Sequence, residues 1–97
     1  MKIPSEIKSN GLVISVERVN GLAVGREDSS LGIYDGNIGC IKLDKMLKGN
    51  ALGDVFFHEI MEHLNDRYEL GLEHDKITQI ATLWYGILKE NGLLKEG

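Results

Sequence analysis

The chain has 97 residues, of which 42% are hydrophobic, so one small domain with a single core, residues 1–97, is expected and a second domain is not. Its net charge of −4 and its scattered lysines and arginines argue against nucleic-acid binding, which usually needs a basic patch. No segment is apolar for long enough to be a signal peptide or a membrane span, and the single cysteine, Cys40, excludes an intrachain disulfide. We therefore expect a soluble protein in a reducing cytoplasm, with no nucleic-acid or membrane partner.

The first half of the chain, residues 1–46, is rich in β-forming residues and glycine. Partial alternation of apolar residues predicts a strand at 11–19, and two further strands are expected at 31–34 and 37–43. The Asp-Gly pair at 35–36 is a strong signal for a two-residue hairpin, because it tolerates positive φ. This half therefore predicts a small antiparallel sheet of about three strands.

The second half, residues 50–92, changes to helical periodicity. It predicts a helix from 51 to about 68, with Asn50 as its N-cap. A second helix is expected from about 75 to 90, and the Asn-Gly pair at 91–92 ends it. The inward stripe of this second helix is predicted to be Ile77, Ile80, Ala81, Trp84, Ile87 and Leu88. The fold class is thus α+β, a sheet followed by two helices.

Three side chains with metal chemistry lie on the first predicted helix: His58, Glu59 and Glu62. Residues four apart share a helix face, so His58 and Glu62 can point at one metal ion, and Glu59 can face a water molecule near that ion. A carboxylate oxygen binds zinc at nearly the same distance as an imidazole nitrogen. Spacing alone leaves two interpretations open, namely a zinc site or a buried His58–Glu62 hydrogen bond without metal.

A catalytic zinc usually has three protein ligands, so a further ligand is required. The candidates are His63, Glu69, Glu73, His74 and Asp75. His63 follows His58 by five residues and is turned away from the metal face, so we expect it to pack or to form hydrogen bonds at the helix surface. A short loop between antiparallel helices brings the start of the second helix near Glu62. This favours His74 as the third ligand, with its two sequence neighbours as alternatives.

Three stretches of the chain, 57–70, 72–77 and 81–88, show a family resemblance, and the first contains His-Glu-Ile-Met-Glu at 58–62. Together they resemble small phage- and prophage-encoded zinc metallopeptidase-like proteins, which are similar to minimal zincins of the SprT and ImmA type. The corresponding helix in that family usually reads His-Glu-x-x-His or His-Glu-x-x-Glu. This chain has the second form.

The resemblance implies that His58, Glu62 and His74 bind zinc and that Glu59 is the general base of a peptidase. Such a protein would cleave a peptide or protein substrate in the cytoplasm of a bacterial host. In zincins, the strand before the helix, here 37–43, commonly offers its edge to the substrate. A non-catalytic, zinc-stabilised module that binds a host or phage protein is the alternative, and a metal-free structural domain is a third hypothesis.

Overall fold

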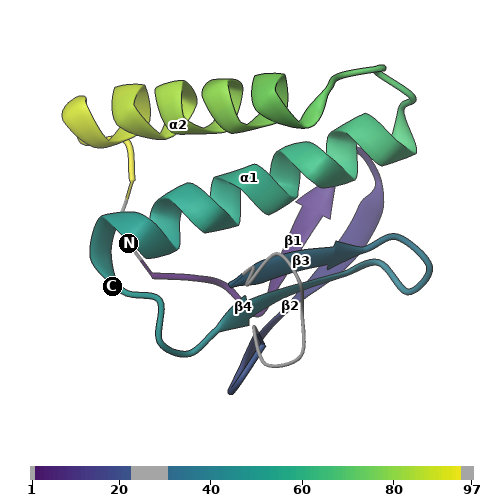
Figure 1. Ribbon diagram of the computed structural model, residues 1–97, viewed down its shortest axis with the longest axis horizontal. Helices are drawn as coiled ribbons and strands as arrows, with labels where there is room; N and C mark the ends of the chain where they lie inside the picture. Colours follow the sequence, from purple (N-terminus) through teal and green to yellow (C-terminus); the bar gives the residue numbers. More distant parts are fainter. Residues whose placement is uncertain (1, 23–30, 95–97) are drawn as a thin grey trace.

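The computed structural model describes residues 2–22 and 31–94, which form a four-stranded sheet and two helices (Figure 1). The elements are β1 (Glu6–Ser9), β2 (Leu12–Val19), β3 (Gly32–Asp35), β4 (Cys40–Asp44), α1 (Gly49–Arg67) and α2 (His74–Glu90). The α+β class is confirmed, with one strand more than expected. Neither of these helices combines the length and the apolar character that crossing a membrane requires.

The sheet is mixed, with strand order β1-β2-β4-β3. β1 pairs antiparallel with β2, and β3 pairs antiparallel with β4, but β2 and β4 run parallel. An entirely antiparallel sheet was therefore the wrong expectation for the central pair. The turn signals in the sequence describe hairpins between consecutive strands, whereas the pairing of β2 with β4 joins strands that are separated by β3 along the chain.

β1 lies outside the predicted strands, although its turn has a strong sequence signal. Asn10 and Gly11 have φ values of 50° and 89°, and they connect Ser9 to its partner Leu12. Two consecutive residues with positive φ form the tight hairpin turn that Asn-Gly favours. The Asn-Gly pair was therefore the signal from which β1 could have been predicted.

The hairpin between β3 and β4 is wider than the predicted two-residue turn. Asp35 pairs with Cys40, so four residues, 36–39, connect the strands. The Asp35 Oδ1 atom accepts a hydrogen bond from the Asn37 amide at 3.0 Å. The aspartate thus closes a local turn with its side chain, which is a second way in which this residue type stabilises turns.

α1 is the middle layer of the molecule. It lies across one face of the sheet, and α2 packs on the side of α1 that faces away from the sheet (Figure 1). The core between α1 and the sheet contains Ile14, Val16, Ile41, Leu43, Leu47 and Phe56. Among the described elements, α2 contacts α1 alone.

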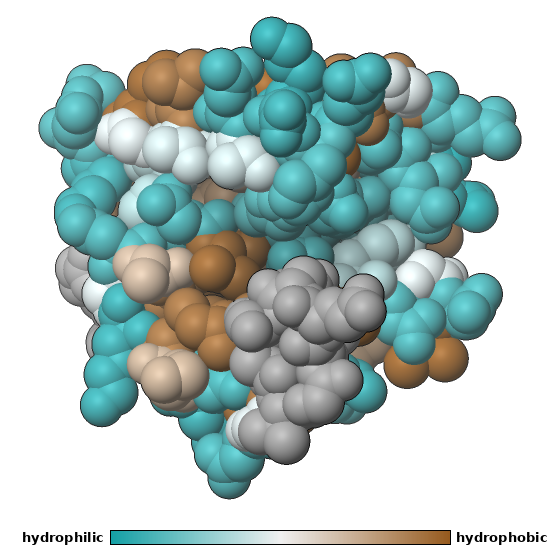
Figure 2. Space-filling view, viewed as in Figure 1, coloured by the Kyte–Doolittle hydropathy of each residue, from teal (hydrophilic) through white to brown (hydrophobic). Residues whose placement is uncertain are grey.

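The predicted inward stripe of α2 is partly wrong. Ile77, Ala81 and Tyr85 are buried at intervals of four residues, but Trp84 and Ile87 are 55% and 50% exposed. Figure 2 shows apolar side chains at the surface along the top of the molecule, where α2 lies. Because α2 packs against a single helix, only a narrow stripe of it is covered.

Both helices begin and end within two residues of the predicted positions, but Asn50 does not cap α1. The N-cap is Lys48, which makes no capping hydrogen bond with its side chain. Instead, the Asn50 side-chain oxygen accepts hydrogen bonds from the Tyr85 hydroxyl, at 3.4 Å, and from the Lys89 ammonium group. Asn50 therefore joins the start of α1 to the second half of α2.

The close approach of β3 to α1 requires glycine at position 32. A methyl group on Gly32 would lie 2.4 Å from Cγ1 of Val55, whose β-branched side chain has few rotamers. We expect Gly32→Ala to lower the free energy of unfolding by about 1–3 kcal/mol. The control is Gly86→Ala, where a methyl group meets nothing within 4 Å and should stabilise α2 by about 0.5–1 kcal/mol. Urea denaturation measures both, and a Gly32→Ala variant as stable as wild type would contradict this packing.

Candidate metal site

The two helices bring three of the predicted site residues together. His58 and Glu62 lie one turn apart on α1, and His74 is the first residue of α2. Each offers one ligand atom, and these three atoms lie within 4.8 Å of one another. Within residues 2–22 and 31–94, this is the one group of three such side chains close enough to share an ion.

The connection between α1 and α2 is held by Asn65, a residue that the sequence analysis missed. Its side-chain amide donates to the Leu72 carbonyl at 3.1 Å, and its side-chain oxygen accepts from the Leu72 amide at 2.8 Å. This pair of hydrogen bonds fixes the loop that precedes His74. After this loop, the His58 and His74 rings lie with their centroids 4.9 Å apart, at an angle of 62°.

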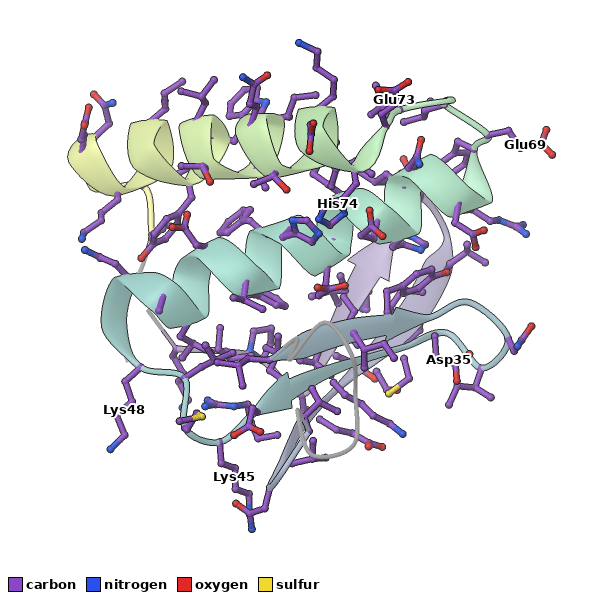
Figure 3. The ribbon with its side chains drawn as sticks, viewed as in Figure 1. Asp35, Lys45, Lys48, Glu69, Glu73 and His74 are labelled. Atoms are coloured by element: carbon purple, nitrogen blue, oxygen red, sulfur yellow. The ribbon has the colours of Figure 1, made fainter. Side chains whose placement is uncertain are left out.

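The other candidates for the third ligand lie outside this group. Figure 3 shows His74 pointing from the start of α2 toward α1, whereas Glu69 and Glu73 lie on the outer side of the turn between the helices. Asp75 is exposed in the first turn of α2. The geometry therefore favours His74 over its two sequence neighbours.

His63 is a core residue on the opposite side of α1. Its side chain is 1% exposed, with Nε2 at 2.9 Å from the Ser9 hydroxyl and Nδ1 at 3.3 Å from the Tyr34 hydroxyl. The Tyr34 ring also meets the imidazole edge-on. His63 thus packs in the interior, which was one of the two expectations, the other being hydrogen bonds at the helix surface. It connects α1 to the two outer strands, β1 and β3.

The burial of His63 gives the fold a pH dependence. Burial lowers the pKa of His63 below 6.5, Arg67 lowers it further, and Asp66 opposes the shift. The unfolded chain therefore binds this proton more readily, and stability falls as pH drops from about 6.5 toward the lower folded-state pKa, by at most about 1.4 kcal/mol per pH unit. We expect the free energy of unfolding of the zinc-free protein to fall between about pH 7.5 and pH 5.5. The zinc-free His63→Gln variant should lose less of its free energy of unfolding over the same pH range. Equal losses in urea denaturation would contradict this role.

Burial also lowers the pKa of His58, which favours the neutral imidazole that metals bind. The Glu62 carboxylate opposes this shift, and His74 adds to it. The Thr78 hydroxyl donates to the His74 carbonyl at 3.1 Å and lies 3.4 Å from Nδ1 of His58. Because its one proton is used, Thr78 can only accept from His58 Nδ1, which leaves the Nε2 lone pair available for a metal.

Thr78 is therefore expected to orient His58. We expect Thr78→Val, which keeps the side-chain shape and removes the hydroxyl, to weaken zinc affinity about 10-fold or more, as the loss of such supporting contacts does elsewhere. Thr82→Val is the matched control, because in the described structure Thr82 bonds to neither histidine. Competition with a fluorescent zinc chelator measures both affinities, and equal values for the two variants would contradict the assignment.

Two surface pockets adjoin His58, Glu62 and His74, which are called the ligand group below. The first, of about 380 Å³, is lined by His58, Glu59 and His74 together with Asp54 and Gly32. The second, of about 480 Å³, is lined by Glu62 and, from the β3 side, by Tyr34. Two of the three candidate ligands therefore line the first pocket and the third lines the second, and each pocket also has a lining residue from β3.

The three ligand residues can hold a metal ion. Two imidazole nitrogens and one carboxylate oxygen are the protein ligands of several catalytic zinc sites. Atoms bound to one tetrahedral zinc lie about 3.4 Å apart, so small side-chain rotations bring atoms within 4.8 Å of one another onto one ion. Comparisons with models of known families, with curated proteins and with solved structures found no match. A function for the chain is therefore inferred from the geometry of this site.

Proposed function

We propose that the chain is a zinc-dependent hydrolase of the metallopeptidase type. The observation on which this rests is the group of His58, Glu62 and His74, whose ligand atoms lie within 4.8 Å of one another, beside the buried carboxylate of Glu59. Zinc held by these residues would polarise a peptide carbonyl and lower the pKa of a water molecule. The His-Glu-x-x-Glu pattern at 58–62 supports zinc over other ions, because it combines the ligand types of zinc peptidases.

Glu59 has the position of a general base. It follows His58 directly on α1, lines the same pocket as His58 and His74, and is 7% exposed. A carboxylate in this position can take a proton from the attacking water and pass it to the leaving amine. Gly32 gives Glu59 room, since a methyl group there would lie 3.1 Å from the Glu59 Oε2 atom.

An extended substrate is expected to pair with β3. β4 cannot offer an edge, because it lies between β2 and β3, so the expectation for the strand at 37–43 is wrong. β3 is one of the two outer strands of the described sheet, and it is the one that contacts α1. A peptide added to β3 through main-chain hydrogen bonds would cross the ligand group and extend into both pockets.

Cleavage of a random peptide library, read by mass spectrometry, tests this proposal. The protein is purified without a metal-binding tag and loaded with one equivalent of zinc. We expect cleavage that stops when a chelator is added, returns with zinc, and is absent from His58→Ala. Metal-independent cleavage would overturn the proposal. So would a zinc-loaded protein that cleaves no peptide, and a chelator that lowered its melting temperature would then identify the non-catalytic, zinc-stabilised module.

A further inference from the structure

We propose that Asp54 binds a positively charged group of the substrate, an ammonium or guanidinium, in the pocket beside the metal ligands. This inference rests on the proposed function, because the pocket is a substrate subsite only if the metal site acts on peptides. Asp54 lies one turn before His58 on α1, so the two side chains share a helix face. Both line the same pocket of about 380 Å³.

One oxygen of Asp54 is buried and has acceptor capacity left. The Asp54 Oδ1 atom makes no hydrogen bond to any of residues 2–22 and 31–94. Buried carboxylate oxygens normally accept hydrogen bonds, because an unmet acceptor destabilises the fold. Asp44 shows the usual case, since its two oxygens accept from the Met46 amide at 2.9 Å and from the Leu22 amide at 2.8 Å. The Asp54 side chain as a whole is only partly buried and lines the pocket, so rotation of its carboxylate can turn this oxygen toward a donor in the pocket.

The charges around this pocket favour a cation. Of its described lining residues, Asp54 and Glu59 are carboxylates, and none is a lysine or arginine. Three carboxylates, those of Asp54, Glu59 and Glu62, would surround a bound zinc ion, which carries two positive charges. No lysine or arginine among the described lining residues offsets the remaining negative charge, and electrostatic attraction is stronger in a partly enclosed pocket than in water.

The neighbours of Asp54 suit a cation on a short apolar stem. The lining of the same pocket includes Leu31 and Val55, which can contact methylene groups, and Thr82 on α2, whose hydroxyl can accept a second N–H bond. One helical turn is about 5.4 Å long, so Asp54 lies roughly that far along α1 from His58. The cation is therefore the α-ammonium group or the side chain of a residue next to the scissile bond.

Hydroxamates of matched shape test this inference, because they bind zinc directly and place their side chain in the adjoining pocket. The probes are N-acetyl-norleucine hydroxamate, which is neutral, N-acetyl-lysine hydroxamate, which adds a side-chain ammonium, and norleucine hydroxamate, which adds an α-ammonium. Affinities for zinc-loaded protein are measured by calorimetry. We expect one charged probe to bind at least about 10-fold more tightly than the neutral probe, as a well-placed charge-assisted hydrogen bond allows, and its identity distinguishes the two sources of the cation.

Asp54→Asn should remove this preference and leave the affinity of the neutral probe unchanged. Glu17→Gln, a change at an exposed position on β2, is the control for the loss of one negative charge and should keep the preference. Equal affinities of all three probes for wild type, or a preference that survives in Asp54→Asn, would overturn the inference even if the variant folded poorly. If the neutral probe failed to bind zinc-loaded protein at all, the proposed function and the inference would both be wrong. If the neutral probe bound and neither charged probe bound more tightly than it, the inference about Asp54 would be wrong while the proposed function would stand.

Discussion

His58→Ala is expected to abolish stoichiometric zinc binding while leaving the fold intact. The variant removes one of the three proposed ligands, and His58 is only partly buried, so its loss opens no cavity in the core. We expect zinc affinity to fall by more than the roughly 10- to 100-fold that the loss of a supporting contact outside the ligand set costs. Calorimetric titration with zinc and a far-ultraviolet circular dichroism spectrum measure the two properties.

His63→Gln is the matched control, because it changes a histidine five residues along the same helix. His63 is 1% exposed and bonds to Ser9 and Tyr34, so its replacement should lower stability and leave zinc affinity nearly unchanged. His58→Ala should do the reverse. If both variants lost zinc to the same extent, the separation of a metal face from a core face on α1 would be wrong.

Glu59→Gln is expected to keep zinc and lose most of the peptidase activity. The amide keeps the size of the side chain but cannot take the proton from water, and a general base typically contributes roughly 10²- to 10⁴-fold in rate. Steady-state cleavage of a peptide identified from the library, with zinc content measured on the same samples, gives both quantities.

Glu69→Gln, at an exposed position after α1, is the control for this variant and should cleave at the wild-type rate. Retention of full activity by Glu59→Gln would refute the role of general base. Loss of zinc together with activity would mean instead that Glu59 supports the ligand set, and that the carboxylates of Glu59 and Glu62 have been assigned the wrong way round.

The ligand group could be predicted because it depends on local geometry. His58 and Glu62 are placed together by the helical repeat alone. His74 follows from a short turn between two helices whose ends were predicted to within two residues. No contact between distant parts of the chain was needed for either step.

The features that sequence analysis missed depend on contacts between distant residues. The parallel pairing of β2 with β4, and the bonds of His63 to Ser9 and Tyr34, join parts of the chain that are far apart in sequence. Asp54 belongs to the same class, because its buried oxygen has meaning only once the walls of its pocket are known. The inward position predicted for Trp84 was wrong for a related reason. Helical periodicity does not show how wide a stripe of α2 is covered, and α1 covers only a narrow one.

The central claim is that His58, Glu62 and His74 bind zinc, and X-ray absorption spectroscopy at the zinc edge tests it most directly. The sample is tag-free protein with one equivalent of zinc. We expect a first shell of about four nitrogen and oxygen atoms at about 2.0–2.2 Å, with the outer-shell scattering of two imidazole rings. This scattering should decrease to that of one ring in His74→Ala. A spectrum of hydrated zinc without imidazole scattering, or a sulfur atom at about 2.3 Å from Cys40, would contradict the account.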